Sequence, residues 1–141
     1  METIRRLGIS REHIRVILIF ILPLLILKFV PLRPVTDSFG IQRFTVPSQE
    51  SATVTLNFNQ GWSVHGSYGE DAGHNLEFTL FKPDGKTIIF TKTNSPVGWF
   101  SFTADLSGIY QVVISNPAQE LTGPTARVTL DVSQEGWIIT I

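Results

Sequence analysis

Apolar and polar residues alternate with a period of two over most of the chain after residue 40. Val54, Leu56 and Phe58 are separated by threonine and asparagine, and the same spacing recurs over 76–80 and 128–132. Successive side chains of a β-strand point to opposite faces of its sheet, so this alternation predicts strands that each bury one face. The chain after residue 40 is therefore expected to be all-β.

Turn-forming residues separate the alternating segments, for example at Asn59–Gly61, Gly66–Gly73 and Lys82–Gly85. The expected strands are 42–46, 53–59, 63–68, 76–82, 87–92, 99–104, 109–115, 126–133 and, as an optional ninth, 137–141. Many short strands at this spacing are typical of an antiparallel sandwich. We therefore predict an all-β, jelly-roll-like sandwich of two sheets, with eight or nine strands and no helix inside it.

The stretch FSFTADLSGIYQVVISN is expected to form two of these strands and the corner between them. Phe100 and Phe102 would face the core, and Tyr110 would lie at the start of the following strand. Gly108 is expected to supply a backbone angle that other residues resist. The Tyr110 hydroxyl is expected to bond to the corner backbone, as tyrosine corners do in sandwiches.

The N-terminal part has a different pattern, with an apolar run at 16–27 that four arginines precede. With its flanks the run extends over 14–32, which is enough for a transmembrane helix of about 20 residues. A cleaved signal peptide has a similar basic start and apolar centre. The residues after the run, KFVPLRPV, offer no pair of small residues for a signal peptidase, so an uncleaved signal-anchor helix is favoured.

This helix predicts a topology for the whole chain. Basic residues stay on the cytoplasmic side of a membrane, so 1–13 is expected in the cytoplasm, with 14–32 in the lipid bilayer. Two prolines predict a short extended linker at 33–39. Residues 40–141 would then form an extracytoplasmic domain of a single-pass protein of the cell membrane.

Charge is divided unevenly between the two parts. Residues 1–34 contain six basic and two acidic residues, so their formal charge is +4, while the remainder contains five basic and ten acidic residues, or −5. Phosphate binding needs a basic patch, so nucleic acid is not an expected partner of the folded part. The chain has no cysteine, which excludes disulfides, thiolate metal sites and thiol catalysis.

A search for catalytic motifs finds no nucleophile elbow, zinc-protease motif or phosphate-binding glycine loop, so neither an enzyme nor a cofactor is expected. One polar cluster, VHGSYGEDAGHN, places His65, Glu70, Asp71 and His74 on one expected hairpin loop. Imidazole and carboxylate groups can bind a metal, but this spacing matches no established site. We favour a solvated loop, in which alanine at His65, Glu70 or His74 would change stability little.

The tryptophans are better candidates for contact with a partner or a lipid. Trp62 and Trp99 lie beside expected turns, and Trp137 begins the uncharged segment WIITI. Aromatic side chains at the ends of a sandwich can contact a partner or a membrane interface. The alternative, which we favour, is that they cover the ends of the core.

Three sequence blocks together resemble a known family: KPDGK, GWFSFTADLSGIYQVVISN and VTLDV. Over roughly residues 40–133 the chain is similar to the GOLD (Golgi dynamics) domain, a β-sandwich, and the pre-peptidase C-terminal domain is a near rival. The GOLD resemblance implies a non-catalytic module for contact with protein or lipid. GOLD cargo receptors have a luminal disulfide and a C-terminal membrane helix, whereas this chain has no cysteine and an N-terminal apolar run. A bacterial or archaeal protein of the membrane-anchored type is therefore expected.

These observations favour a membrane-anchored, non-catalytic binding module that contacts another envelope protein, a lipid or a glycan. The alternative is a structural subunit of a surface filament or envelope assembly, because pilins also place an apolar helix before a β-domain. In such subunits the helix follows the leader directly. Here Gly8 is followed by ISREHIR, whose charged side chains are hard to bury in a filament, so this alternative ranks second.

Overall fold

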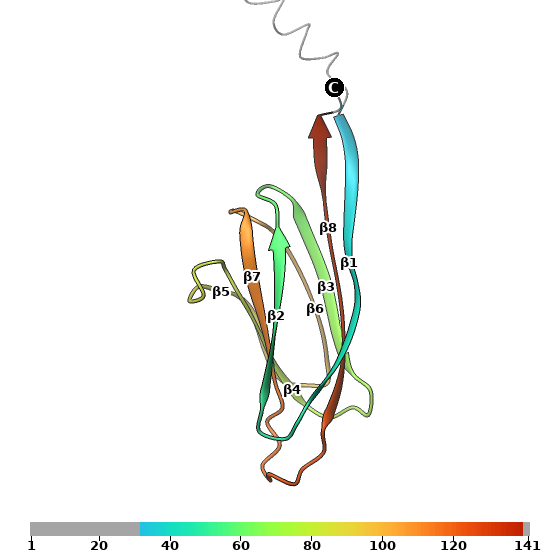
Figure 1. The fold of residues 1–141 in the computed structure, drawn as a ribbon, viewed down its shortest axis with the longest axis vertical. Coiled ribbons are helices and arrows are strands. Elements are labelled where there is room, and N and C mark those ends of the chain that lie inside the picture. Colours follow the sequence, from blue (N-terminus) through green and yellow to red (C-terminus); the bar gives the residue numbers. More distant parts are fainter. Residues whose placement is uncertain (1–31, 140–141) are drawn as a thin grey trace, which may run out of the picture. The chain divides into compact units, whose positions relative to one another are not determined.

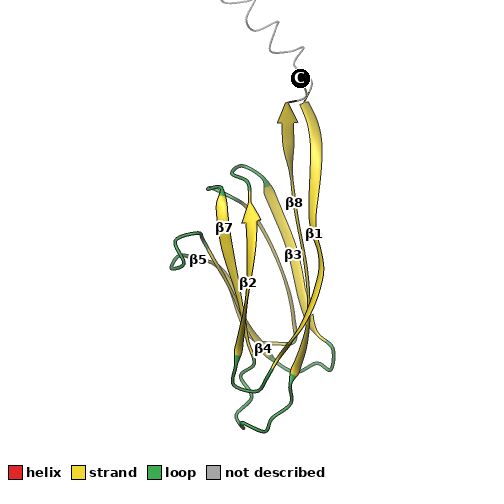
Figure 2. Cartoon of the chain, in the orientation of Figure 1, coloured by secondary structure: helices red, strands yellow, loops and turns green. Residues whose placement is uncertain are grey.

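The computed structural model describes residues 32–139, which form eight strands joined by loops (Figure 2). The strands are β1 (Leu32–Val46), β2 (Ser51–Phe58), β3 (Ser63–Glu70), β4 (Leu76–Phe81), β5 (Ile88–Ser95), β6 (Val97–Thr103), β7 (Gly108–Ser115) and β8 (Ala126–Ile139). The part from 32 to 139 contains no helix that is long and apolar enough to cross a membrane. The predicted anchor lies outside the described residues except for Leu32, so it stays a prediction.

The strands form two four-stranded sheets, in the orders β1-β8-β3-β6 and β2-β7-β4-β5 (Figure 1). The first strand therefore neighbours the eighth, the second the seventh, the third the sixth and the fourth the fifth, which is the strand order of a jelly roll. Residues Pro34–Gly136 make up one compact unit. The prediction of an all-β, two-sheet sandwich is confirmed.

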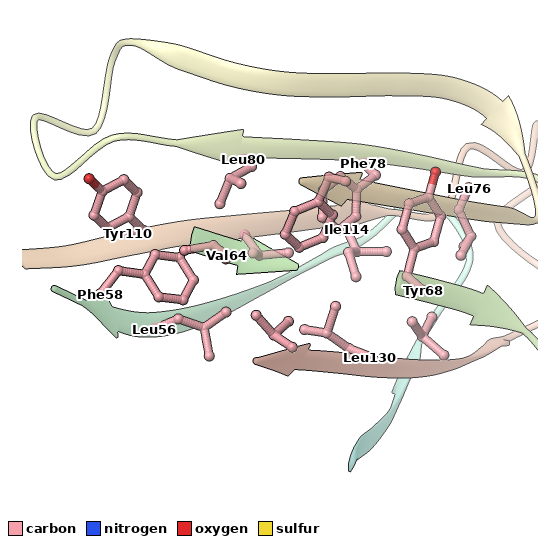
Figure 3. Close-up of a cluster of buried hydrophobic side chains, with 14 of the residues drawn as sticks. Leu56, Phe58, Val64, Tyr68, Leu76, Phe78, Leu80, Tyr110, Ile114 and Leu130 are labelled. Carbon is pink, nitrogen blue, oxygen red and sulfur yellow. The ribbon is translucent and has the colours of Figure 1, made fainter. Parts of the chain in front are cut away.

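The core lies between the two sheets and consists of the inward residues of the alternating segments (Figure 3). Phe78 is at its centre, because its ring stacks on Tyr68 with centroids 4.4 Å apart and on Phe100 at 5.4 Å. Burying one large apolar side chain contributes about 1.5–3 kcal/mol. Aromatic residues of β3, β4 and β6 thus join the two sheets.

The corner between β6 and β7 has the predicted geometry. The hydroxyl of Tyr110 donates a hydrogen bond to the backbone oxygen of Leu106 at 2.7 Å, and the tyrosine is fully buried. Gly108 has a φ of 151°, and a side chain there would also approach Pro83. Both residues therefore serve the architecture of the sandwich.

The prediction that residues 33–39 form a linker is wrong, because these residues lie inside β1. Pro34 lacks a backbone N–H, but β1 is the edge strand of its sheet, where a missing donor is tolerated. The alternation is interrupted at Gly40, which has a φ of 74°. In a regular strand, residues five positions apart point to opposite faces, yet Phe39 and Phe44 both pack against the core. The alternation of apolar and polar residues therefore predicted only the second half of β1.

Two further boundaries differ from the sequence-based expectation. The optional ninth strand is the continuation of β8, which runs without a break to Ile139. Gly66 and Gly69 lie inside β3 and not in a turn. At Gly66 an added Cβ would come within 2.2 Å of the Phe100 ring, so the glycine makes room for an aromatic side chain of the neighbouring strand. The turn after β3 therefore starts only beyond Glu70.

Candidate functional site

A shallow groove crosses the outer face of strands β8, β3 and β6. On this face Ser67 lies opposite Asp131 of β8 and Trp99 of β6. The next row places His65 opposite Ser133 of β8 and Ser101 of β6. The groove has a volume of about 430 Å³, and its outward side chains are His65, Ser67, Trp99, Ser101, Asp131 and Ser133. We call this set the Trp99 groove.

Trp99 is the only large apolar side chain that points outward in the groove, and 71% of its surface is exposed. It lies on the edge strand β6, and its cross-strand neighbour on β3 is the small Ser67, which leaves the indole uncovered on that side. The ammonium group of Lys92 lies 5.6 Å from the centre of the ring. Tryptophan is highly buried on average in folded proteins, so an uncovered indole beside polar groups is unusual.

His65 is held in place by two polar neighbours on the same face. Its Nε2 lies 3.2 Å from Oε1 of Glu135, and its Nδ1 lies 3.1 Å from the hydroxyl of Ser101. Serine, histidine and glutamate also make up hydrolase triads, which additionally require donors for an oxyanion. Strand β3, which carries His65, is paired on both sides, so its own backbone N–H groups serve the sheet. The arrangement orients the imidazole as a hydrogen-bonding group of the groove.

Glu70 belongs to the interior, which corrects the expectation of a solvated loop. Its side chain is only 1% exposed. One carboxylate oxygen accepts hydrogen bonds from the backbone N–H groups of Ala72 and His74, at 2.9 and 2.7 Å. The other oxygen accepts a hydrogen bond from the backbone N–H of Arg127 at 3.1 Å. Burial by itself would raise the pKa of Glu70, but these hydrogen bonds outweigh it and lower the pKa below its usual value. Glu70 therefore ties the turn after β3 to the start of β8.

The polar cluster expected on one loop is divided between three environments. His65 lies in the Trp99 groove, Glu70 is buried, and only Asp71 and His74 lie in the turn itself. Nδ1 of His74 is 3.4 Å from Oε1 of Glu70. Among residues 32–139, no three histidine, aspartate or glutamate side chains gather closely enough to hold a metal ion.

The three tryptophans also differ in their surroundings. Trp62 is half-buried and its ring lies over Gly136, where an added Cβ would come within 2.4 Å of the indole. Trp137 is 65% exposed near the end of β8. Trp62 therefore packs against the sandwich, whereas Trp99 and Trp137 are available for contact.

Sequence reasoning named Trp99 as a contact candidate and His65 as a possible metal ligand on a loop, but it missed the residues that surround them. Alternation along each strand predicts that Ser67, Ser101 and Ser133 point outward. It does not say that β3 lies between β6 and β8, and this strand order alone brings the three serines together.

The fold and the groove define a β-sandwich domain with a polar sheet face that carries an exposed aromatic side chain. A family model described as emp24/gp25L/p24 family/GOLD matches residues 42–138. The chain therefore belongs to the emp24/gp25L/p24/GOLD family, which confirms the resemblance noted in the sequence. The chain matches none of the curated proteins with which it was compared.

The chain is similar to solved bacterial structures at low sequence identity. A Bacillus endospore appendage protein, described as forming disulfide-linked pili, is 14% identical with a TM-score of 0.54, covering 78% of this chain and 92% of that one. PliG of Aeromonas hydrophila, a periplasmic inhibitor of g-type lysozyme, is 18% identical with a TM-score of 0.49, covering 76% and 89%. At these identities the similarity concerns the fold alone.

Proposed function

We propose that this protein is a membrane-anchored, non-catalytic binding module outside the cytoplasm of a bacterium or archaeon, and that it binds its partner at the Trp99 groove. The observation that carries the proposal is the 71% exposed indole of Trp99, surrounded by serine hydroxyls, an imidazole and a carboxylate. Aromatic side chains combined with a few polar groups are typical of binding surfaces.

Of the three partner classes, namely envelope protein, lipid and glycan, a glycan matches this chemistry best. A sugar ring has an apolar face of C–H groups that can stack on an indole, and a rim of hydroxyls that can bond to Ser67, Asp131 and Ser133. A lipid chain would leave these polar groups without partners, which costs free energy. The shallow groove also suits a flat ring better than a bulky side chain.

Binding can be tested with the full chain in a polyoxyethylene detergent, which contains no sugar. Soluble peptidoglycan fragments and neutral oligosaccharides of glucose and of N-acetylglucosamine serve as probes in isothermal titration calorimetry. We expect saturable binding of at least one probe and a loss of about tenfold or more in Trp99→Ala, which corresponds to about 1.4 kcal/mol. Trp137→Ala is the matched control and should bind normally. If no probe binds, or if both variants bind like the wild type, the glycan proposal is wrong.

The anchored topology rests on the basic N-terminus and the apolar run at 16–27. The protein should stay with membranes after an alkaline carbonate wash. Protease added to intact cells or spheroplasts should digest residues 40–141 and leave the N-terminus intact. A mature N-terminus between Val30 and Thr36 would contradict the anchor.

A second candidate is a structural subunit of a surface assembly, which two observations favour. The chain shares its fold with the endospore appendage protein, which forms pili. Strand β2 is an edge strand without charge, proline or glycine, and it pairs with β7 in unbroken register over all eight residues. Such edges can accept a strand of another molecule. Filaments in electron micrographs of the native envelope, labelled by an antibody to the domain, would favour this candidate, and a monomer in detergent would favour the binding module.

A further inference from the structure

A second hollow of about 250 Å³ lies on the face of strands β1 and β8. Strand β1 contributes Arg43 and Thr45, and β8 contributes Arg127 and Thr129. The two strands are neighbours in one sheet. Phe44, Val128 and, from the turn after β3, Asp71 complete the lining. We call this hollow the arginine pocket.

The arginine pocket is distinctive because the surrounding domain is acidic. Residues 35–141 carry five basic and ten acidic residues, and Arg43 and Arg127 are their only arginines. Both arginines line the same hollow and are exposed. Like charges on neighbouring strands repel each other, so this placement costs free energy unless an anion compensates for it.

No carboxylate of the described residues forms an ion pair with either arginine. The ion pairs found between 32 and 139 involve His65, His74 and Lys82, and none involves either arginine. Of the lysines, Lys82 pairs with Asp105 and Lys92 lies over the ring of Trp99. Asp71 lines the pocket, but its carboxylate makes no ion pair with Arg43 or Arg127 within this part of the chain.

We propose that the arginine pocket binds an anionic group, a phosphate or a carboxylate. The guanidinium group is a planar fork of donors that matches both kinds of oxyanion, and hydrogen bonds to charged groups are stronger than those between neutral groups. The hydroxyls of Thr45 and Thr129 are further donors at the same hollow. Asp71 at its edge repels a second negative charge, so the preferred ligand carries one anionic group beside hydroxyl or ammonium groups.

The arginine pocket adjoins the Trp99 groove along β8. Alternate residues of one strand point to the same face about 7 Å apart. Strand β8 places Arg127 and Thr129 in the pocket and Asp131 and Ser133 in the groove, all at this two-residue spacing. One extended ligand could therefore reach both. The inference itself depends on the arginine pair and does not rest on glycan binding at Trp99.

The test uses the full chain in a polyoxyethylene detergent at physiological salt. Inorganic phosphate, glucuronate and uncharged glucose are titrated, and binding is followed through the side-chain NMR signals of arginine. Phosphatidylcholine nanodiscs with and without phosphatidylglycerol distinguish a lipid headgroup from a soluble anion. We expect phosphate, glucuronate or phosphatidylglycerol to shift the signals of Arg43 and Arg127, and glucose to leave them unchanged.

Three variants separate specific binding from general charge attraction. Arg43→Gln and Arg127→Gln should each lower the affinity for the bound anion by about tenfold or more, because each removes a charged donor. Lys86→Gln removes an exposed cation that does not line the pocket and should bind like the wild type. NMR spectra of the backbone confirm that each variant is folded.

Each outcome decides the proposal. The proposal is supported if phosphate, glucuronate or the anionic lipid shifts the arginine signals and the two arginine variants lose this response. The ligand that causes the shift identifies the source of the anion. The proposal is overturned if none of the anions shifts these signals, or if Lys86→Gln weakens binding as much as the arginine variants do. If no anion binds while a neutral oligosaccharide still does, the arginine pocket fails and the Trp99 groove stands.

Discussion

Trp99 and Tyr110 lie on consecutive strands but in opposite environments. Tyr110 is fully buried, and its hydroxyl is bonded to the backbone of the corner. Trp99 is 71% exposed on the outer face of its sheet, with a lysine beside its ring. Two large aromatic residues of one short stretch therefore have different roles, because the strand pleat turns one toward the core and the other toward solvent.

A similar contrast separates the two glutamates of strands β3 and β8. Glu70 is buried and accepts three backbone hydrogen bonds, whereas Glu135 is exposed and, among the described residues, its carboxylate pairs only with His65. Residue type alone thus says little about role in this sandwich. Stability should depend on Tyr110 and Glu70, and binding on Trp99 and the polar residues around it.

The largest expected effect is that of Tyr110→Ala. It removes a buried ring and a hydrogen bond, and changes of this kind lower the free energy of unfolding by about 3–5 kcal/mol. Tyr110→Phe keeps the ring and should cost only about 1 kcal/mol, because it leaves the oxygen of Leu106 without its partner. Denaturant unfolding measures both. Equal losses in the two variants would show that the ring itself contributes little.

Next in size is Gly66→Ala, with Gly69→Ala as its matched control on the same strand. A Cβ at Gly66 would overlap the ring of Phe100, whereas at Gly69 its nearest neighbour would be Val97 at an ordinary 3.8 Å. Overpacking a core costs about 1–3 kcal/mol, so Gly66→Ala should melt well below the wild type. Gly69→Ala should be near neutral. Similar melting temperatures for both variants would argue against the close contact between β3 and β6.

The third prediction concerns acid and Glu70. Its native pKa is lowered from the usual 4.5, so it stabilises the native state above that pH, and this contribution is lost as the pH falls through the native pKa. Glu70→Gln should therefore be less stable than the wild type at pH 7, by about 1–3 kcal/mol. The difference should shrink below about pH 4. Asp84 and Asp105 also have lowered pKa values, but both remain in the variant and cancel in this comparison.

Unfolding curves of the wild type and Glu70→Gln between about pH 7 and pH 3 test this dependence. His74→Ala removes the side-chain contact to Glu70 but keeps the three backbone hydrogen bonds, so it should retain most of the pH dependence. A constant difference across the whole range would contradict a carboxylate that is ionised in the native state.

The smallest expected effects on stability are those of Trp99→Ala and His65→Ala. Both side chains are exposed, and surface substitutions usually change the free energy of unfolding by less than about 0.5 kcal/mol. Thermal melts of these two variants beside Tyr110→Ala therefore separate the groove from the core. A costly Trp99→Ala would mean that the indole is part of the scaffold, and the proposed contact surface would lose its main support.

Part of this molecule is determined by the sequence by itself. Alternation locates the inward residues of most strands, because a strand must bury one face to be stable. The local signals at Gly108 and Tyr110 are enough to predict the corner, since its backbone angle and its hydrogen bond involve residues only a few positions apart.

The rest was decided by tertiary structure. The first half of β1 lacks a regular alternation and became a strand because β8 pairs with it. Glu70 is buried by the start of β8, which lies 57 positions away in the chain. The Trp99 groove and the arginine pocket each combine residues of strands that are neighbours only in the folded sandwich. Periodicity reports the face of a residue but not its cross-strand neighbours, so only the strand order could bring these side chains together.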